Sequence, residues 1–334
     1  MLPDMSYFLY QLSFDGPVHL GDTSMGGGLE QAGWTYTSDT LFSSICTELA
    51  GQGEYRVLDD FVKLALESKL LLSDLFPYQL SEGDELQLFL PLPYITLGNS
   101  GDQVGLTWEE AKIVSARRKK SKRQMYCRVS ELQQYCDSLR AGTQYEPATD
   151  MELGDEFITT RVNCRGEQSL PYFVKGNVFQ PRAGLYLIAQ LPDSFGEVFQ
   201  NILCSLGLSG IGGKRSSGFG RFHLHDDGLE LDDAYEWYAD TRVLHTMLTG
   251  EHKRYMCLSS VLPSTDELDA VKAGTYKLRK VSGFSEGIKR DSIYMLESGS
   301  CFDCRLQGQL AELGSQAGHP VWRYGKGLSA GLDV

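Results

Sequence analysis

The residues with the clearest chemical potential lie in a glycine-rich segment that runs from Gly207 to Arg221. Six of the fourteen residues from 207 to 220 are glycine, and Lys-Arg-Ser-Ser interrupts them at 214–217. Glycine lets the backbone adopt positive φ and approach a ligand closely, and successive exposed N–H groups form a concavity that binds anions. The basic residues and serine hydroxyls add charge and donors. The segment therefore predicts a phosphate-binding loop, with an ordinary tight helix-to-strand connection as the alternative.

The common nucleotide-binding motifs do not fit this loop. A Walker loop that placed its lysine at Lys214 would need glycine at 208 and serine or threonine at 215, where the chain has Leu208 and Arg215. A dinucleotide fingerprint starting at 210 or 218 would need glycine at 215 or 223, and neither position has it. The loop also follows a predicted helix and precedes a predicted strand, the reverse of both motifs. No nucleotide cofactor is expected.

The charge distribution favours a local phosphate track on an acidic body. The net charge is −13, which argues against a protein that coats nucleic acid non-specifically. Yet residues 112–128 contain eight lysines or arginines and no acid, and six of the seven residues at 117–123 are basic. Residues 225–240 carry seven acids and no lysine or arginine. A basic run is often only a solvated face, but here it contrasts with the rest of the chain.

Neither histidine nor cysteine spacing predicts a metal centre. His223 and His225 lie two apart on a predicted strand and share a face, so an acid–base pair or a two-histidine metal site is conceivable there. Surface histidines are the simpler interpretation. Cys301 and Cys304 have CxxC spacing, but no second pair completes the four ligands of a structural zinc site. We expect no bound metal.

Composition indicates a two-domain chain that remains in the cytoplasm. The chain has 334 residues, 42% hydrophobic and 11% aromatic, which suits two compact domains. The eight cysteines are scattered, as free thiols of a reducing compartment would be. The N-terminus has no signal-peptide pattern, and no apolar run approaches the roughly 20 residues that span a bilayer.

Hydrophobic periodicity predicts the elements around the loop. Residues 6–14 alternate as a strand, and a helix begins at Ser38, whose hydroxyl can cap it, and stops at Gly51. Residues 57–72 form a further predicted helix, and 85–97 an edge strand. An insertion follows at about 111–177, with a short helix at 129–139 and a polar loop. Residues 184–191 resume as a strand.

The helix before the glycine loop has the clearest signals. Ser194 and Glu197 form a capping box, and Gly207 stands where a C-cap glycine belongs. Residues 219–224 then alternate as a strand. This order is that of the β-α-β-β-α-β ferredoxin-like, or RRM-type, unit.

The chain after the acidic stretch predicts a second, shorter unit of the same kind. A strand at 254–261 and a helix capped by Ser264 and Glu267 are followed by strands at 275–281, 291–297 and 301–310. Trp322 and Tyr324 mark a last strand. We therefore expect an α+β protein with two ferredoxin-like domains at 1–225 and 251–334, joined by an acidic connector at 226–250.

The loop resembles the signature loop of the RAMP superfamily of CRISPR proteins, which lies between the second helix and the last strand of a ferredoxin-like domain. Three further segments make the whole chain similar to the fourth subunit of the type III-A (Csm) effector complex. These are Val18-His-Leu-Gly with the segment 38–43, the motif 289–300, and the closing strand 319–326. The loop alone indicates the superfamily, and the four segments in order indicate the subunit.

The resemblance implies a non-catalytic subunit that holds the repeat-derived 5′ tag of the crRNA. Such subunits contact the large polymerase-palm subunit and the first backbone RAMP subunit, and a hairpin in the first domain acts as a thumb on the guide–target RNA duplex. Tag binding is expected at residues of the loop, namely Gly212, Gly213, Lys214, Arg215, Ser216, Ser217 and Gly218.

Further RNA contacts are predicted outside the loop. Ser38 lies at a helix N-terminus suited to an anion, although a plain N-cap is as good an explanation. The basic run would lie in the thumb and would position RNA without reading sequence. It comprises Arg117, Arg118, Lys119, Lys120, Lys122 and Arg123. Lys289 and Arg290 belong to the C-terminal motif.

Two other functions remain open at this point. The superfamily includes metal-independent ribonucleases that process pre-crRNA with a histidine, and His19 lies near the loop, so it is a candidate base as well as an RNA contact. The other alternative is a protein-only scaffold in which the glycines merely turn the backbone.

Overall fold

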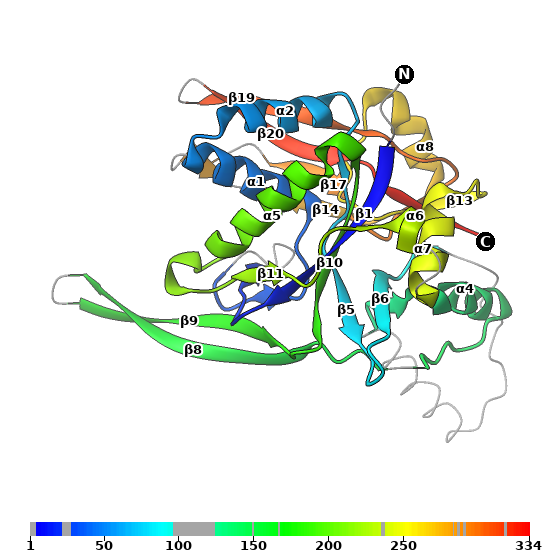
Figure 1. Cartoon of the computed structure of the whole chain (residues 1–334), viewed down its shortest axis with the longest axis horizontal. Coiled ribbons are helices and arrows are strands. Elements are labelled where there is room, and N and C mark those ends of the chain that lie inside the picture. The colour runs from blue at the N-terminus through cyan, green and yellow to red at the C-terminus, as the bar shows by residue number, and fades with distance from the viewer. Residues whose placement is uncertain are drawn as a thin grey trace.

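The structure is a computed structural model and describes residues 5–21, 28–95, 124–148, 150–165, 168–234, 238–282, 284–285, 288–289, 292–316 and 319–334. Within these ranges no helix is long and apolar enough to cross a membrane. Figure 1 shows a body of helices and strands from which one long hairpin projects.

A large antiparallel sheet forms the centre of the body. Its strands lie in the order β11 (Phe222–Leu224), β1 (Met5–Phe14), β10 (Ala183–Pro192), β5 (Phe76–Leu80), β6 (Leu86–Pro91) and β7 (Tyr126–Arg128). Two short strands join beside this path, β12 (Leu229–Glu230) on β1 and β4 (Leu71–Leu72) on β10. The predicted strands at 6–14, 184–191 and 219–224 are confirmed, with the last one shorter than expected.

Both faces of the sheet are buried, because alternate residues of each central strand enter different cores. Tyr10 and Leu185 face one hydrophobic cluster, whereas their neighbours Leu9 and Tyr186 face the other. This explains why β10 is apolar from Leu185 to Ala189, since a strand covered on both sides needs no polar face.

Three helices cover the first face: α1 (Ser38–Gln52), α2 (Tyr55–Leu66) and α5 (Gly196–Ser209). Figure 1 shows them grouped on one side of β1 and β10. The other face packs against α7 (Ala239–Thr249) and the C-terminal strands. Thus the predicted acidic connector contains helical structure, with α6 (Leu231–Ala234) before α7. Asp240 is fully buried and accepts hydrogen bonds from Leu88 N (2.9 Å) and Arg128 Nε (2.9 Å).

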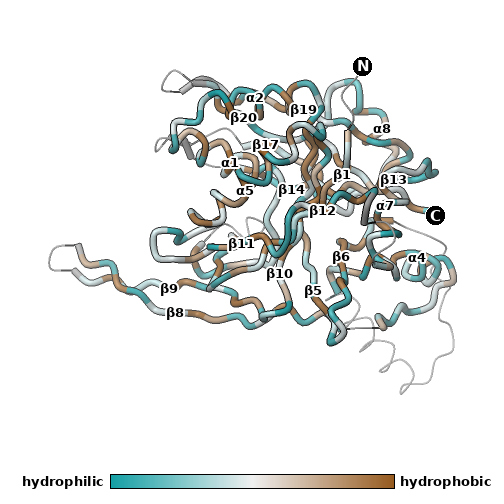
Figure 2. Tube along the Cα trace, viewed as in Figure 1, coloured by the Kyte–Doolittle hydropathy of each residue, from teal (hydrophilic) through white to brown (hydrophobic). Residues whose placement is uncertain are grey.

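The insertion contains more regular structure than the sequence predicted. The expected helix near 129–139 is present as η2 (Val129–Glu131) and α4 (Leu132–Ala141). The expected polar loop is instead a long hairpin of β8 (Gly154–Arg165) and β9 (Gln168–Phe179). It projects from the body in Figure 1, and its hydrophobic stretches stand out in Figure 2. The sequence did not predict these strands because the solvent-exposed face of the hairpin carries apolar side chains, such as Ile158, Val162 and Phe173, so that hydrophobic residues do not alternate with polar ones.

The C-terminal part adds several small sheets. A three-stranded sheet has the order β18 (Cys301–Phe302), β13 (Arg254–Cys257) and β21 (Ser329–Leu332). The C-terminal part also contains two-stranded pairs: β14 (Leu278–Val281) with β17 (Ile293–Leu296), β15 (Phe284–Ser285) with β16 (Ile288–Lys289), and β19 (Gly308–Gln316) with β20 (His319–Lys326). Near the N-terminus, β2 (Leu20–Gly21) pairs with β3 (Ala32–Gly33). The strand that contains Trp322 and Tyr324 is β20. It was predicted to be the last strand, but β21 follows it.

The capping predictions were right at one helix and wrong at two. The Ser264–Glu267 capping box is present at η5 (Thr265–Glu267), which leads into α8 (Leu268–Ala273). At α5 the predicted box is absent, since the turn η3 (Asp193–Phe195) precedes the helix and no side chain caps it. The N-cap of α1 is Thr37 rather than Ser38, and it also makes no side-chain cap bond.

Two further local predictions were wrong for packing reasons. Gly207 lies inside α5, which ends at Ser209, and a Cβ at Gly207 would clash with the carbonyl oxygen of Phe222. The glycine therefore allows α5 to lie close to β11. The strand at 85–97 is no edge, because β6 pairs with β5 on one side and with β7 on the other.

Candidate nucleic-acid interface

The glycine-rich loop joins α5 to β11 and is fastened to the chain at both ends. Ile211 N donates to the carbonyl of Gly220 (2.9 Å), which closes the loop on itself. Gly213 N donates to the carbonyl of His19 (2.8 Å), and Gly220 N to that of Pro17 (2.9 Å). The loop is therefore held against residues 17–19, directly after β1.

Positive φ angles give the loop its shape. Gly210, Gly212, Gly218 and Gly220 have φ between 77° and 84°, in the region that favours glycine. Lys214 also adopts a left-handed conformation, with φ 62°. A non-glycine residue in this region is uncommon and indicates that the surrounding contacts impose it.

The centre of the loop faces solvent. Residues 215–218 are exposed and form the turn η4 (Arg215–Ser217), closed by hydrogen bonds from Ser217 N to Lys214 O (2.8 Å) and from Gly218 N to Arg215 O (2.9 Å). The N–H groups of Arg215 and Ser216 donate to no acceptor among the described residues. These backbone donors, the two serine hydroxyls and two cationic side chains can all bind an anion such as phosphate.

The inner face of the hairpin borders the loop and adds residues that the sequence did not single out. Arg161 Nη1 donates to Ser217 Oγ (3.2 Å), and its guanidinium lies 5.8 Å from the centre of the Phe219 ring. Lys214 Nζ lies 4.8 Å from the centre of the Tyr172 ring and 3.4 Å from its hydroxyl. Sequence alternation could have placed Arg161 and Tyr172 on strands, but only the folded hairpin brings them to the loop.

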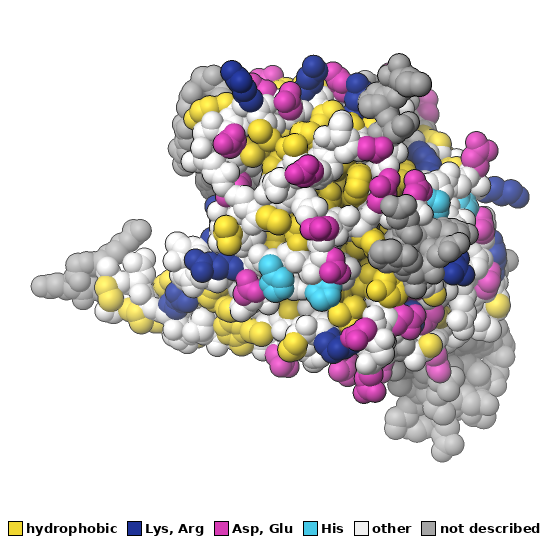
Figure 3. Space-filling model, viewed as in Figure 1, with side chains coloured by type: hydrophobic (Ala, Val, Ile, Leu, Met, Phe, Trp, Pro, Cys, Tyr) yellow, Lys and Arg dark blue, Asp and Glu magenta, His cyan; other side chains and the backbone are white. Residues whose placement is uncertain are grey.

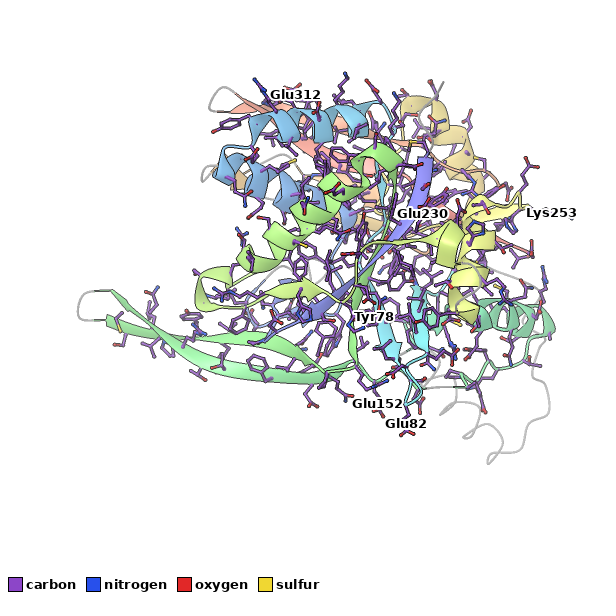
Figure 4. The ribbon with its side chains drawn as sticks, in the orientation of Figure 1. Tyr78, Glu82, Glu152, Glu230, Lys253 and Glu312 are labelled. Carbon is purple, nitrogen blue, oxygen red and sulfur yellow. The ribbon has the colours of Figure 1, made fainter. Side chains whose placement is uncertain are left out.

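The charges at this junction are not neutralised within the described part of the chain. There Arg161, Lys214 and Arg215 make no ion pair with a carboxylate, whereas Arg128, Arg279 and others do. Figure 3 shows Lys and Arg side chains gathered beside the α5–β11 loop, close to the hairpin. Figure 4 marks acidic side chains on other parts of the surface, at Glu82, Glu152, Glu230 and Glu312.

His19 lies beneath the loop rather than on its surface. It is 5% exposed, and its Nδ1 donates to the carbonyl oxygen of Lys175 (2.7 Å), which can only accept. A Cβ at Gly213 would approach the His19 ring to 2.5 Å. The imidazole thus joins the loop to β9 as a packed support, and this position does not favour its prediction as a general base or as a direct RNA contact.

The predicted anion contact at Ser38 is wrong, because the helix terminus is already occupied. Ser38 is fully buried, and its backbone N donates to the carboxylate of Asp74 (2.8 Å). Asp74 also accepts from Ser260 N (3.1 Å), and its burial raises its pKa. The carboxylate at the N-terminus of α1 is therefore supplied by the protein itself, which is favourable for the helix dipole.

The remaining predicted contacts are not brought to the loop by the described structure. The basic residues 117–123 and Arg290 lie outside the described residues. Lys289 is described in its backbone only, where it pairs with Phe284 in the β15–β16 ribbon.

The two histidines near the loop have separate carboxylate neighbours and do not converge. His223 Nδ1 lies 2.8 Å from Asp15 Oδ1, and His225 Nε2 lies 4.0 Å from Asp226 Oδ2. Cys301 is buried and Cys304 is exposed, and all eight cysteines are free thiols. In the ranges that the structure describes, no group of three or more histidine, cysteine or acidic side chains could hold a metal ion.

Comparison with known proteins finds CRISPR proteins that are similar to this chain along its full length. Residues 250–332 match the CRISPR Csm4 C-terminal domain family. The chain is 29% identical over 340 residues to the Streptococcus thermophilus protein "CRISPR system Cms protein Csm4", covering 99% of this chain and 100% of that protein. A Mycobacterium tuberculosis protein of the same name is 28% identical over 338 residues, covering 98% of each.

Solved structures share the fold at low sequence identity. A Csm1–Csm4 cassette in complex with pppApA matches with a TM-score of 0.59 and 15% identity, covering 98% of both chains. A Csm3–Csm4 subcomplex of the type III-A CRISPR-Cas interference complex matches with a TM-score of 0.57 and 12% identity, covering 98% of this chain and 100% of the other.

The mixed α and β fold with its large antiparallel sheet is shared with solved Csm4-containing structures, and the sequence similarity to CRISPR proteins extends over the full length of the chain. The relatives that match over the full length are named Csm4, and residues 250–332 match the Csm4 C-terminal domain family. These names agree with the family that the four sequence motifs indicated.

Proposed function

We propose that this chain is a non-catalytic, crRNA-binding subunit of a type III-A CRISPR interference complex, and that the loop at 212–218 holds the repeat-derived 5′ tag. The observation that carries the proposal is the exposed turn at 215–218. It is fixed by backbone bonds to the segment after β1 and presents cations without carboxylate partners among the described residues. Such a turn fits the phosphates of a nucleic acid and has no feature that cleaves one.

The arrangement of strands supports two ferredoxin-like domains. In space the strands lie in the order β11, β1, β10 and β5, which are the fourth, first, third and second strands of the predicted unit, with α1 following β1 and α5 preceding β11. In such a unit the connection from the second helix to the last strand lies at one end of the sheet, where the glycine-rich loop is found. The second domain is proposed to span 251–334, in accordance with the match at 250–332.

The proposed partners follow from relatives of the same fold. Because related chains occur in a Csm1–Csm4 cassette and in a Csm3–Csm4 subcomplex, we propose that this chain bridges the large polymerase-palm subunit and the backbone RAMP subunit. It would meet target RNA only through the guide duplex. As part of such a complex, it is expected in the cytoplasm. The residues 117–123, Lys289 and Arg290 remain proposed RNA contacts.

RNA binding tests the central part of the proposal. We expect the full chain to bind single-stranded RNA carrying the 5′ repeat remnant, measured by fluorescence anisotropy between 50 and 300 mM salt, roughly the range in which phosphate contacts dominate affinity. In the double variant Lys214→Ala, Arg215→Ala, binding should weaken, and the log–log salt slope should become shallower by about 0.7 for each lost phosphate contact.

A matched double variant controls for net charge. Lys253 and Lys272 are exposed, and Figure 4 shows Lys253 at the side of the body opposite the hairpin. Lys253→Ala, Lys272→Ala should leave both affinity and slope unchanged. Equal affinity of the loop variant and the wild type would refute the phosphate role of the loop and support the scaffold function.

Assembly tests the bridging role separately. The chain purified from its host should carry a large subunit, a backbone subunit and RNA with a uniform 5′ repeat remnant. Recovery of both proteins with RNA of random 5′ ends would contradict tag binding but not bridging.

A further inference from the structure

Arg161 and Tyr172 stand directly opposite each other in the hairpin and both reach the glycine loop. They are register partners in β8 and β9, so their side chains lie on the same face. The same face carries Phe157, whose ring lies 6.2 Å from that of Phe219 in the loop. The hairpin therefore does not merely project past the loop, because its inner face is packed against it.

The contact between Lys214 and Tyr172 is one that RNA would replace. The ammonium lies over the aromatic ring at 4.8 Å, and the left-handed backbone of Lys214 sets its direction. A cation over a ring is held by the ring quadrupole, whereas a phosphate offers full negative charge and strong acceptor oxygens. A phosphate bound at the loop would draw the ammonium away and uncover the ring face.

The Arg161 guanidinium beside the loop has N–H donors that could bind a further acceptor. Its guanidinium has five N–H donors, of which one contact is formed, to Ser217 Oγ at 3.2 Å. Among the described residues no carboxylate pairs with it, and the Phe219 ring supports its flat face. A guanidinium that is oriented but not neutralised is suited to a phosphate next to the one at the loop.

We propose that Arg161 and Tyr172 form a second wall of the RNA site. Arg161 binds a phosphate together with Ser217, and Tyr172 stacks one unpaired base after Lys214 has left its ring. The proposal rests on the RNA-binding function proposed above and adds to it a requirement for a single-stranded nucleotide with an exposed base. An aromatic face beside cations without acidic neighbours is how proteins bind single strands, and it favours RNA over an apolar protein partner.

The test uses the full chain and repeat-derived RNA in which 2-aminopurine replaces one base at a time. Tyr172→Phe keeps the ring and should therefore retain the quenched fluorescence at one position. Tyr172→Leu keeps an apolar side chain without the ring, so binding should weaken about five-fold or more and the quenching should disappear. Arg161→Gln should weaken binding and make the salt slope shallower by about 0.7.

Asn163→Ala is the matched control, because residue 163 lies on the same strand face two positions further out. It should match the wild type in affinity, slope and fluorescence. Circular dichroism and the urea midpoint show whether each variant is folded, and the Phe and Gln variants provide readouts if the Leu variant is not.

The outcomes separate this inference from the function on which it rests. If the loop double variant loses RNA binding while Tyr172→Leu and Arg161→Gln bind normally, the second wall is refuted and the loop function stands. If Tyr172→Phe is as weak as Tyr172→Leu, the hydroxyl matters and base stacking is wrong. If the hairpin variants keep RNA affinity but lose a neighbouring subunit on co-purification, the wall is a protein contact and the inference is overturned.

Discussion

Asp39 and Arg323 form a buried ion pair between positions 284 residues apart in the chain. Arg323 Nη1 lies 2.8 Å from Asp39 Oδ2, and Arg279 Nη2 lies 3.1 Å from Asp39 Oδ1. The pair joins the N-terminus of α1 to β20, two segments that sequence similarity had marked separately. The pair therefore holds the N- and C-terminal parts of the chain together.

Removing one partner of this pair should be costly. Arg323→Met would leave the buried carboxylate of Asp39 with Arg279 alone, and a loss of about 3–5 kcal/mol in the free energy of unfolding is expected. Urea unfolding measures it. The double variant Asp39→Asn, Arg323→Met should lose less than the sum of the single variants, since the pair is coupled. Additive losses would contradict the pairing, and Glu67→Gln in the exposed pair with Lys69 should leave the midpoint unchanged.

The buried carboxylate of Asp74 should make stability depend on pH. Burial raises its pKa in the folded state above the ordinary value, so the folded chain keeps the proton to a higher pH than the unfolded chain does. The contribution of Asp74 to the stability of the fold is fully present below the unfolded-state pKa of about 3.9, and it is lost as the pH rises through the folded-state pKa. Relative to Asp74→Asn, the wild type should therefore lose stability with rising pH. The free energies of unfolding of the two proteins are compared from about pH 4 upward, the start of this window. A constant difference between them would contradict the predicted pH dependence.

Two loop glycines can be compared to separate two effects of a substitution, namely the cost of a positive φ and the cost of a clash with a neighbouring residue. Gly212 and Gly218 have φ of 80° and 84°, but a Cβ at 212 would clash with the carbonyl oxygen of His19, whereas one at 218 meets no atom within 4 Å. Gly218→Ala should cost about 1–2 kcal/mol for the left-handed conformation alone. Gly212→Ala should cost about 1–3 kcal/mol more. Thermal unfolding measures the loss of stability in each variant. Equal losses would mean that the loop can shift away from His19 without cost.

His19 should matter for stability rather than for RNA cleavage. His19→Leu leaves the buried carbonyl of Lys175 without its donor, which should cost about 1–3 kcal/mol. His19→Asn keeps an N–H donor at a similar distance from the backbone and should cost less. Wild-type protein incubated with labelled repeat RNA in EDTA should leave the RNA intact. Specific cutting that disappears in His19→Ala would instead establish the processing ribonuclease.

Local signals in the sequence were reliable where neighbouring residues decide the structure. The alternation at 6–14 and the apolar run at 184–191 predicted β1 and β10, and the box at Ser264 and Glu267 caps α8 as expected. Local signals misled where distant residues take part. Ser38 was predicted to cap a helix and to bind an anion, but its polar groups instead contact Asp74 and Ser260. These residues are far away in the sequence, so no local pattern indicates the contacts.

The sequence by itself determined the resemblance to Csm4 proteins and the position of the basic glycine loop between a helix and a strand, because both depend on residue types at fixed spacing. Only the tertiary structure decided what surrounds the loop. Placing His19 beneath it and Arg161 and Tyr172 beside it requires the sheet to bring β1 next to β11 and the hairpin to fold back on the loop. These contacts depend on packing between segments far apart in the chain, and no local pattern records them.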